Sequence, residues 1–370
     1  MSEITKENYL EKLFINEAKP ALDTKAGGGS NEDFIGVIQR NVENVTLPKG
    51  LTSIGPNAFY NHSVLKSVTI PKGVTNIGVY AFGYCPNLTS ITIPEGLTSI
   101  GGNAFYSCGN LESVSLPKGL ISIDSSAFSG CTKLSSIDIP EGVTSIGDQA
   151  FYNCGLTSVA LPEGLSKINY STFNNCTKLK SISIPKGVTT IDNYAFAGCT
   201  SMTSVSLPDG LTAIGNYAFN NCSSLTSIRI PKGVTSIGQN TFNNCSSLLG
   251  AVLPEGVTSI GQYAFGNCSK LSGVSMPEGV TEIANYAFYN CSSLTGITIP
   301  ASVTSIGQYA LGYSGLQSAT FKGKPNSINT YAFNGCSKLT MINVPWAEGE
   351  VAGAPWGANY NVRINYNYQG

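Results

Sequence analysis

A repeat of 23 residues constrains the fold of this chain more than any other feature. Prolines mark its copies at Pro48, Pro71, Pro94, Pro117, Pro140, Pro162, Pro185, Pro208, Pro231, Pro254, Pro277, Pro300 and Pro345, and Lys322 holds the proline slot of one more copy. The step shortens to 22 residues before Leu156 and before Leu316. Self-similarity at this period predicts a solenoid, in which each copy, here called a rung, buries its apolar side chains against its neighbours. We therefore expect one long repeat domain over residues 42–345.

Each rung carries the same local signals, which are clearest over residues 88–108. Ile91 and its apolar neighbours alternate with polar residues, which predicts a short strand with its apolar side inward. A proline ends this strand, and Gly96 indicates a turn that needs positive φ. The slot of Gly101 holds Gly, Asn or Asp in most rungs, which predicts a second left-handed bend. The chain should then enter a short helical turn, with Phe105 in the core.

The cysteines form a column. All eleven occupy one slot, fourteen residues after the marker: Cys85, Cys108, Cys131, Cys154, Cys176, Cys199, Cys222, Cys245, Cys268, Cys291 and Cys336. Stacked strands place such side chains about 4.8 Å apart and parallel, whereas a disulfide needs Cβ atoms about 3.8 Å apart that face each other. We therefore predict buried, reduced thiols that act as small apolar residues, with metal binding or redox sensing as the alternatives.

The pattern of the rungs is similar to that of a known family. Leu-x-x-Ile-x-Ile-Pro-x-x-Leu-x-x-Ile-Gly-x-x-Ala-Phe-x-x-Cys, as it stands from Leu88 to Cys108, resembles the Treponema pallidum-type, or BspA-like, leucine-rich repeats. The resemblance covers residues 42–345. It implies an α/β-type solenoid, a curved right-handed superhelix with a parallel β-sheet on one face and short helical turns on the other. It also implies a use in surface adhesion and ligand recognition.

The N-terminal residues differ in composition from the rungs. Over residues 1–26, apolar Leu10, Leu13 and Phe14 recur at helical spacing, which predicts a short amphipathic helix. We expect this helix to attach the protein to partner copies or to a larger particle. The alternative is a helix that folds back over the first rung. Residues 27–41 predict a Gly-rich tether followed by a cap at the start of the stack.

After residue 345 the repeat stops. Residues 346–370 end in a strictly alternating run that puts Tyr360, Val362 and Ile364 on one face, which predicts a C-terminal β cap that closes the last rung. Residues 344–358, with the Asn/Tyr-rich strand that follows, look like the end of leucine-rich-repeat proteins encoded in phages and prophages of gut Firmicutes.

Composition argues against several classes of function. The formal net charge is −1 and only 12% of residues are charged, so the electrostatic attraction that drives nucleic-acid binding is missing. No apolar run is long enough for membrane insertion, and the N-terminus lacks the apolar core of a secretory signal. The single histidine, His62, sits in the cysteine slot of an early rung, where a core role is favoured over a general base. Without a metal-ligand, nucleophile or phosphate-loop motif, we predict no enzyme activity, no cofactor and no metal site.

Candidate ligand-binding residues are those that break the repeat or add aromatic surface. The outward strand slots are mostly Ser and Thr, a pattern that could engage a glycan or could only keep the sheet soluble. A column of tyrosines two residues before the Phe could offer rigid contact area or could pack between rungs. The candidates are Asp138, Arg229, Val252, Tyr194, Tyr217, Tyr263 and Tyr286.

Three hypotheses of function follow. The first is a component of a phage tail or phage-like particle, assembled in the bacterial cytoplasm, that recognises a bacterial surface protein or glycan. The second is a secreted BspA-like adhesin whose signal has been removed. The third is an intracellular scaffold that binds a protein partner. A gene located among tail genes would favour the first.

Overall fold

The computed structural model describes residues 33–34, 42–47 and 49–369. The predicted helix with Leu10, Leu13 and Phe14 lies outside the described residues, as does most of the predicted tether. The chain divides into two compact units, one ending at Leu165 and the other beginning at Ser166, and each is described by itself.

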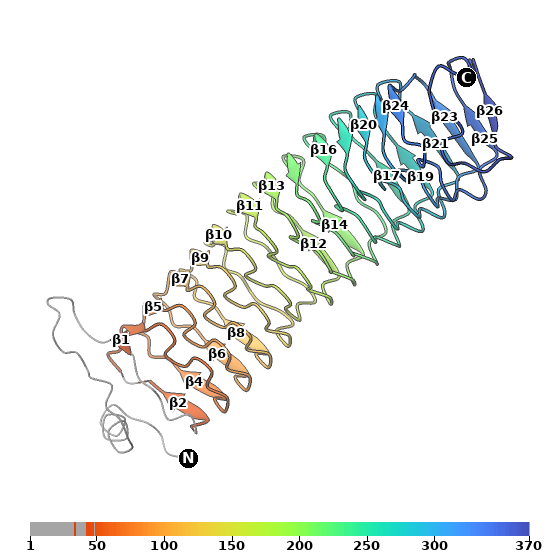
Figure 1. Cartoon of the computed structure of the whole chain (residues 1–370). Helices are drawn as coiled ribbons and strands as arrows, with labels where there is room; N and C mark the ends of the chain where they lie inside the picture. Colours follow the sequence, from red (N-terminus) through yellow and green to blue (C-terminus); the bar gives the residue numbers. More distant parts are fainter. Residues whose placement is uncertain (1–32, 35–41, 48, 370) are drawn as a thin grey trace, which may run out of the picture. The chain divides into compact units, whose positions relative to one another are not determined.

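Most rungs contribute two short strands, and these gather into two strips (Figure 1). We call the strands before the proline the first strip and those after it the second strip. In unit 1 the first strip comprises β2 (Asn44–Thr46), β4 (Ser67–Thr69), β6 (Ser90–Thr92) and β8 (Ser113–Ser115). Its second strip comprises β1 (Asp33–Phe34), β3 (Ser53–Ile54), β5 (Asn76–Ile77), β7 (Ser99–Ile100), β9 (Ser122–Ile123) and β10 (Ser145–Ile146).

Unit 2 repeats this arrangement. Its first strip comprises β12 (Ser181–Ser183), β14 (Ser204–Ser206), β17 (Gly250–Val252), β19 (Gly273–Ser275), β21 (Gly296–Ile299), β23 (Ser318–Phe321), β25 (Met341–Asn343) and β26 (Arg363–Asn365). Its second strip comprises β11 (Lys167–Ile168), β13 (Thr190–Ile191), β15 (Ala213–Ile214), β16 (Ser236–Ile237), β18 (Ser259–Ile260), β20 (Glu282–Ile283), β22 (Ser305–Ile306) and β24 (Ser327–Ile328).

The strands pair in parallel and in the register that the repeat sets. Ser90 of β6 lies opposite Ser113 of β8, one period along the chain. Within β6, Ile91 is buried between exposed Ser90 and Thr92, because side chains alternate across a strand. The predicted parallel solenoid with apolar residues inward and hydroxyls outward is therefore confirmed.

The single sheet expected on one face is wrong in two respects. The second apolar segment of each rung is also a strand, so two strips exist where one was predicted. The first strip is also divided into shorter sheets: the segments around Asp138, Val159 and Arg229 form no strand, and β4 is not paired with β6, nor β19 with β21.

The predicted helical turns are also wrong, because no helix occurs among the described residues. In the Ala-Phe segment only alternate backbone N–H groups bond within the rung, as from Ala81 to the Gly78 carbonyl at 3.1 Å. The groups between them reach the next rung, as from Phe82 to the Ala104 carbonyl at 2.8 Å. A helix would need every N–H for its own i−4 carbonyl, so bonding between rungs excludes it.

Phenylalanine and cysteine columns fill the core. In unit 1 the rings of Phe82 and Phe105 stack with centroids 5.3 Å apart, and the same stacking continues in unit 2 from Phe173 to Phe288. All eleven cysteines are buried and none forms a disulfide bond, and their burial confirms the predicted inward-facing column. The Cys108 thiol donates a hydrogen bond to the Phe82 carbonyl of the preceding rung at 3.0 Å. His62, in the same slot, is also buried.

The C-terminal residues add one more strand and a tryptophan cluster. β26 pairs in parallel with β25, with Ile364 opposite Ile342. Trp346 and Trp356 are buried, and the Phe333 N–H donates to the Trp356 carbonyl at 3.0 Å. The alternating run is a strand only over Arg363–Asn365. Tyr360, which was expected to share its protected face, is fully exposed.

Candidate interaction surfaces

Asp138, Arg229 and Val252 occupy the same outward slot of different rungs. All three are exposed, and the Val252 side chain is unusual for an apolar residue because 71% of its surface is open. Arg229 lies 3.6 Å from Asp209, a pair so exposed that solvent screens most of its attraction. Arg229 and Val252 lie in consecutive rungs of unit 2, whereas Asp138 belongs to unit 1. All three point outward from the rungs and provide exposed polar and apolar side chains.

The tyrosine column is the stronger feature. Tyr194 and Tyr217 stack with centroids 4.6 Å apart and planes 9° from parallel. Tyr263 and Tyr286 repeat this geometry at 4.6 Å and 5°. The column is interrupted between these pairs because the intervening rung has Asn240 in the tyrosine slot.

The second pair belongs to a larger group, which we call the C-terminal tyrosine cluster. It consists of Tyr263, Tyr286, Tyr289, Tyr309, Tyr313 and Tyr331. Tyr289 meets the Tyr286 ring edge-on at 5.5 Å, and Tyr313 meets Tyr289 in the same way at 5.4 Å. Sequence reasoning missed Tyr289 and Tyr313 as partners because they hold other slots of the rung. The signal that could have found them is their position three and four residues after the tyrosine slot.

A smaller group, the N-terminal tyrosine cluster, lies in unit 1. Tyr60, Tyr80, Tyr84 and Tyr106 form a closed circuit of edge-on and tilted contacts, with centroids between 5.2 and 6.1 Å apart. It uses the same three slots of the rung as the C-terminal tyrosine cluster. Of these four residues, only Tyr80 lies two residues before a Phe and so belongs to the tyrosine column expected from the sequence.

The tyrosine slot has an unusual backbone conformation. Tyr263, Tyr286 and Tyr309 have φ values of 53°, 60° and 50°, in the left-handed region. That region is disfavoured for a bulky side chain and tolerated by asparagine, which holds the same slot as Asn103 and Asn240. The bond from the Tyr286 N–H to the Gln308 carbonyl, at 2.9 Å, helps to hold the conformation. The backbone conformation of this slot therefore favours asparagine over tyrosine.

The cluster is electrically neutral near pH 7. Burial raises the pKa of the Tyr263 phenol above its ordinary value of 10.0, and repulsion from Tyr286 and Tyr289 adds to the rise. The Tyr263 phenol therefore stays protonated and keeps its hydroxyl donor. The result is a neutral aromatic surface with polar edges, which is suited to protein or saccharide contacts.

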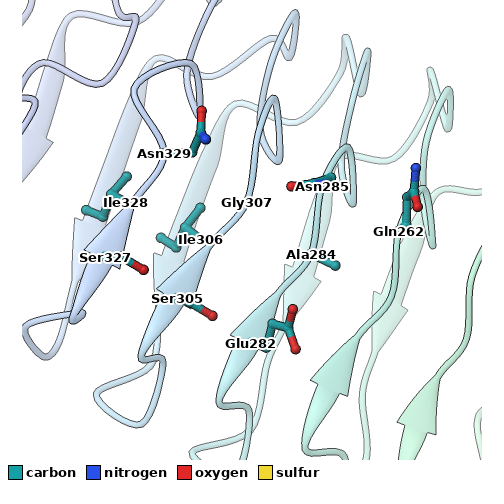
Figure 2. A pocket seen from close by; sticks show the side chains of 10 residues that line it. All are labelled: Gln262, Glu282, Ala284, Asn285, Ser305, Ile306, Gly307, Ser327, Ile328 and Asn329. Carbon is teal, nitrogen blue, oxygen red and sulfur yellow. The ribbon is translucent and has the colours of Figure 1, made fainter.

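A second surface is a polar depression at the corner that follows the second strip of unit 2 (Figure 2). Its volume is about 350 Å³. Its polar lining comes from Gln262, Glu282, Asn285, Ser305, Ser327 and Asn329. Buried Ile306 and Ile328 supply apolar atoms. None of these residues was singled out from the sequence, because each looks like an ordinary polar residue of its slot.

Within the part of the chain that the structure describes, no group of histidine, cysteine or acidic side chains could hold a metal ion. Burial raises the pKa of the Cys222 thiol to about 12, which makes it a poor ligand and nucleophile at neutral pH. No helix of the described residues is long and apolar enough to cross a bilayer.

The comparisons with known proteins agree with this architecture. The model of the BspA type leucine rich repeat region matches residues 38–156, 121–249 and 247–348. A leucine-rich repeat protein from Bacteroides ovatus is 29% identical with a TM-score of 0.71, over 87% of this chain and 91% of that protein.

Two more solved structures are similar. The pneumococcal vaccine antigen PcpA has a TM-score of 0.54 at 19% identity, over 88% of this chain and 79% of that one, a likeness in fold alone. The leucine-rich repeat protein of T. pallidum is 28% identical with a TM-score of 0.41, over 50% of this chain and 78% of that one. Among curated proteins, no relative of significant similarity was found.

Proposed function

The chain belongs to the BspA-type leucine-rich repeat family, and from this we propose that it is a non-enzymatic recognition protein that adheres to a bacterial surface ligand. Repeat proteins of this kind offer long surfaces on which binding sites are grafted. The ligand that we propose is a surface protein or a surface glycan, bound through the faces of the rungs.

The C-terminal tyrosine cluster carries this proposal. Four of its six members, Tyr263, Tyr286, Tyr309 and Tyr313, hold positions where the left-handed backbone favours asparagine, so these aromatic rings need a reason other than folding. Rigid aromatic side chains give a large contact area at low entropic cost, which is why they are enriched at binding surfaces. Six of them in one neutral group form the largest such surface of unit 2.

The binding role is tested by changing three tyrosines to the residue that the backbone prefers. The variant Tyr263→Asn/Tyr286→Asn/Tyr309→Asn removes three of the six rings, all at positions with left-handed φ, without adding backbone strain. A fluorescently labelled variant should lose at least about tenfold in binding to a panel of intact bacterial cells, as expected for the loss of aromatic anchors.

The matched control is Tyr194→Asn/Tyr217→Asn, which removes a stacked pair from the same slot outside the cluster. It should bind cells like the unchanged protein, and both variants should keep their melting temperatures. Equal binding by all three proteins would refute a recognition role for the cluster.

A particle is the setting that we favour. Buried thiols without disulfide bonds fit assembly in the reducing bacterial cytoplasm. In this setting Leu10, Leu13 and Phe14 would attach the protein to the particle or to partner copies. Deleting residues 1–30 should abolish particle incorporation or oligomerisation and leave the melting profile unchanged. Loss of the first rungs on deletion would instead indicate a cap.

The alternatives are a secreted or cell-surface adhesin and an intracellular scaffold. The family match is compatible with both. A gene among tail genes would support the particle, whereas detection of the protein on intact cells without phage induction would support the adhesin.

A further inference from the structure

We propose that the polar depression of unit 2 binds one pyranose unit of a neutral saccharide. This inference goes beyond the proposed adhesion function and does not depend on the tyrosine cluster. A volume of about 350 Å³ lies at the lower end of the range for small-ligand sites, which run from about 300 to 1,000 Å³.

Two amide groups in the depression have fixed orientations. The Asn285 side-chain oxygen accepts the Gln308 backbone N–H at 2.7 Å. The Asn329 side-chain oxygen accepts the Tyr331 N–H at 3.0 Å. Because each oxygen is held by the backbone, each side-chain NH₂ is set as a donor whose direction is fixed before a ligand arrives.

The acceptor is Glu282, whose carboxylate stands out from β20 in Figure 2. Glu282 takes part in no ion pair among the described residues. Ser305 and Ser327 on the neighbouring strands add hydroxyl groups that both donate and accept. The set of two donors, one strong acceptor and two hydroxyls complements the vicinal hydroxyl groups of a sugar.

Charge excludes other ligand classes. No lysine or arginine lines the depression, and Glu282 would repel a phosphate or carboxylate. A single carboxylate gives too few hard ligands for a divalent cation. Small Ala284 and Gly307 offer apolar surface to the C–H face of a pyranose ring. A neutral polyol with one apolar face fits all of these features.

The same corner elsewhere in unit 2 shows what is particular about this one. The residue equivalent to Glu282 is Lys167 in the first rung of the unit, and its ammonium group lies 2.8 Å from Asp192. There the lysine and the aspartate form an ion pair with each other. At the depression no basic partner is present, so Glu282 is available to a ligand.

The test uses saturation-transfer NMR and calorimetry on the full chain with glucose, galactose, mannose and N-acetylglucosamine as probes. At least one probe should bind with a millimolar dissociation constant, as expected for a shallow site with few hydrogen bonds. Glu282→Ser, which copies the residue of the neighbouring rungs, should weaken binding by about tenfold or more.

Asn285→Ala should weaken binding to a similar degree, and Asn216→Ala is its matched control. Asn216 holds the same slot, and its side-chain oxygen accepts the Gln239 N–H at 2.8 Å, so both variants lose the same bond between rungs. Only Asn285→Ala should weaken sugar binding. The variant Tyr263→Asn/Tyr286→Asn/Tyr309→Asn should still bind the sugar. Failure of the saccharide proposal can therefore be distinguished from failure of the adhesion proposal. Saturation transfer from none of the four sugars, or binding unchanged by both Glu282→Ser and Asn285→Ala, would overturn the proposal.

Discussion

Glycines at the corners of the rungs are needed for space rather than for backbone conformation. A Cβ atom on Gly147 would lie 2.5 Å from the Ser125 backbone nitrogen, closer than real Cβ contacts allow. This slot was predicted to need left-handed φ, but Gly147 is not among the residues with positive φ. The left-handed residue stands two positions later, as Gln149 with φ 57°. The pattern of Gly, Asn and Asp therefore located the corner but did not show that space, rather than backbone conformation, is the reason for glycine there.

Two Gly→Ala substitutions distinguish a steric requirement for glycine from a conformational one. Gly147→Ala forces a backbone shift between rungs and should lower the free energy of unfolding by about 1–3 kcal/mol, the usual cost of overpacking. Gly119→Ala, where no atom lies within 4 Å of the added Cβ, should be neutral or stabilising by up to about 1 kcal/mol. Urea unfolding measures both values. Equal effects would show that space at the corner is not limiting.

The thiol column makes stability depend on alkaline pH. Burial raises the pKa of the Cys222 thiol to about 12 from its ordinary value of 9.0, so the folded state keeps a proton that the unfolded chain releases. Its contribution is complete below about pH 9 and is lost as the pH rises from about 9 to 12. The free energy of unfolding should fall over this window by about 1.4 kcal/mol per pH unit for each such thiol.

Tyrosines and lysines also titrate in this range, so Cys222→Ala supplies the comparison. Between pH 9 and 11, the free energy of unfolding of Cys222→Ala should fall less steeply than that of the unchanged protein, by about 1.4 kcal/mol per pH unit. Chemical denaturation measures both values. An identical slope in the two proteins would show that the buried thiol does not carry the effect.

At the scale of elements, sequence reasoning found the period, the first strand and the inward columns. It missed the second strip because two-residue strands, such as Ser99–Ile100, are too short to show alternation. It expected a helix at Phe105 because backbone bonds to the next rung leave no mark in the sequence of a single rung. It found Tyr263 and Tyr286 by column but not the depression at Glu282. That depression is lined by residues of four neighbouring rungs, an arrangement that no single slot records.

The C-terminal element makes a distinct prediction. Trp356 is fully buried, its ring nitrogen donates to the Ala352 carbonyl at 2.8 Å, and its ring centroid lies 6.3 Å from that of Phe321. Trp356→Ala should cost about 3–5 kcal/mol of local stability, the usual cost of removing a buried aromatic ring. Hydrogen exchange should show lost protection in β23, β25 and β26.

Tyr360→Ala is the control in the same segment. Tyr360 is aromatic but fully exposed, so its removal should change stability by no more than about 0.5 kcal/mol. A similar loss in both variants would mean that the tryptophan cluster does not hold the last strands together.

At the scale of the molecule, stability arises between neighbouring rungs. Phe196 stacks on Phe173 and Phe219, its neighbours in the column of unit 2. In such a stack the total is approximately a sum of intrinsic and nearest-neighbour contributions. Disturbance at one rung should therefore spread only a short way.

Phe196→Ala tests this locality. The substitution should cost about 3–5 kcal/mol and remove hydrogen-exchange protection from the adjoining rungs of unit 2. Protection in β21, β23 and β25 should persist. A single cooperative transition with uniform loss of protection would contradict nearest-neighbour coupling.

The two rungs of 22 residues show how the repeat tolerates change. Gly155 and Gly315 stand where a residue is missing, and a Cβ atom on either would collide with the carbonyl of Thr132 or Ser292 in the preceding rung. A one-residue deletion is thus accommodated only with glycine at the closest approach. Insertion or loss of a complete rung, in contrast, restores every backbone bond to an equivalent partner. Recombination between copies within the gene would therefore lengthen or shorten the protein by whole repeats, and binding surfaces could be gained or discarded without redesign of the core.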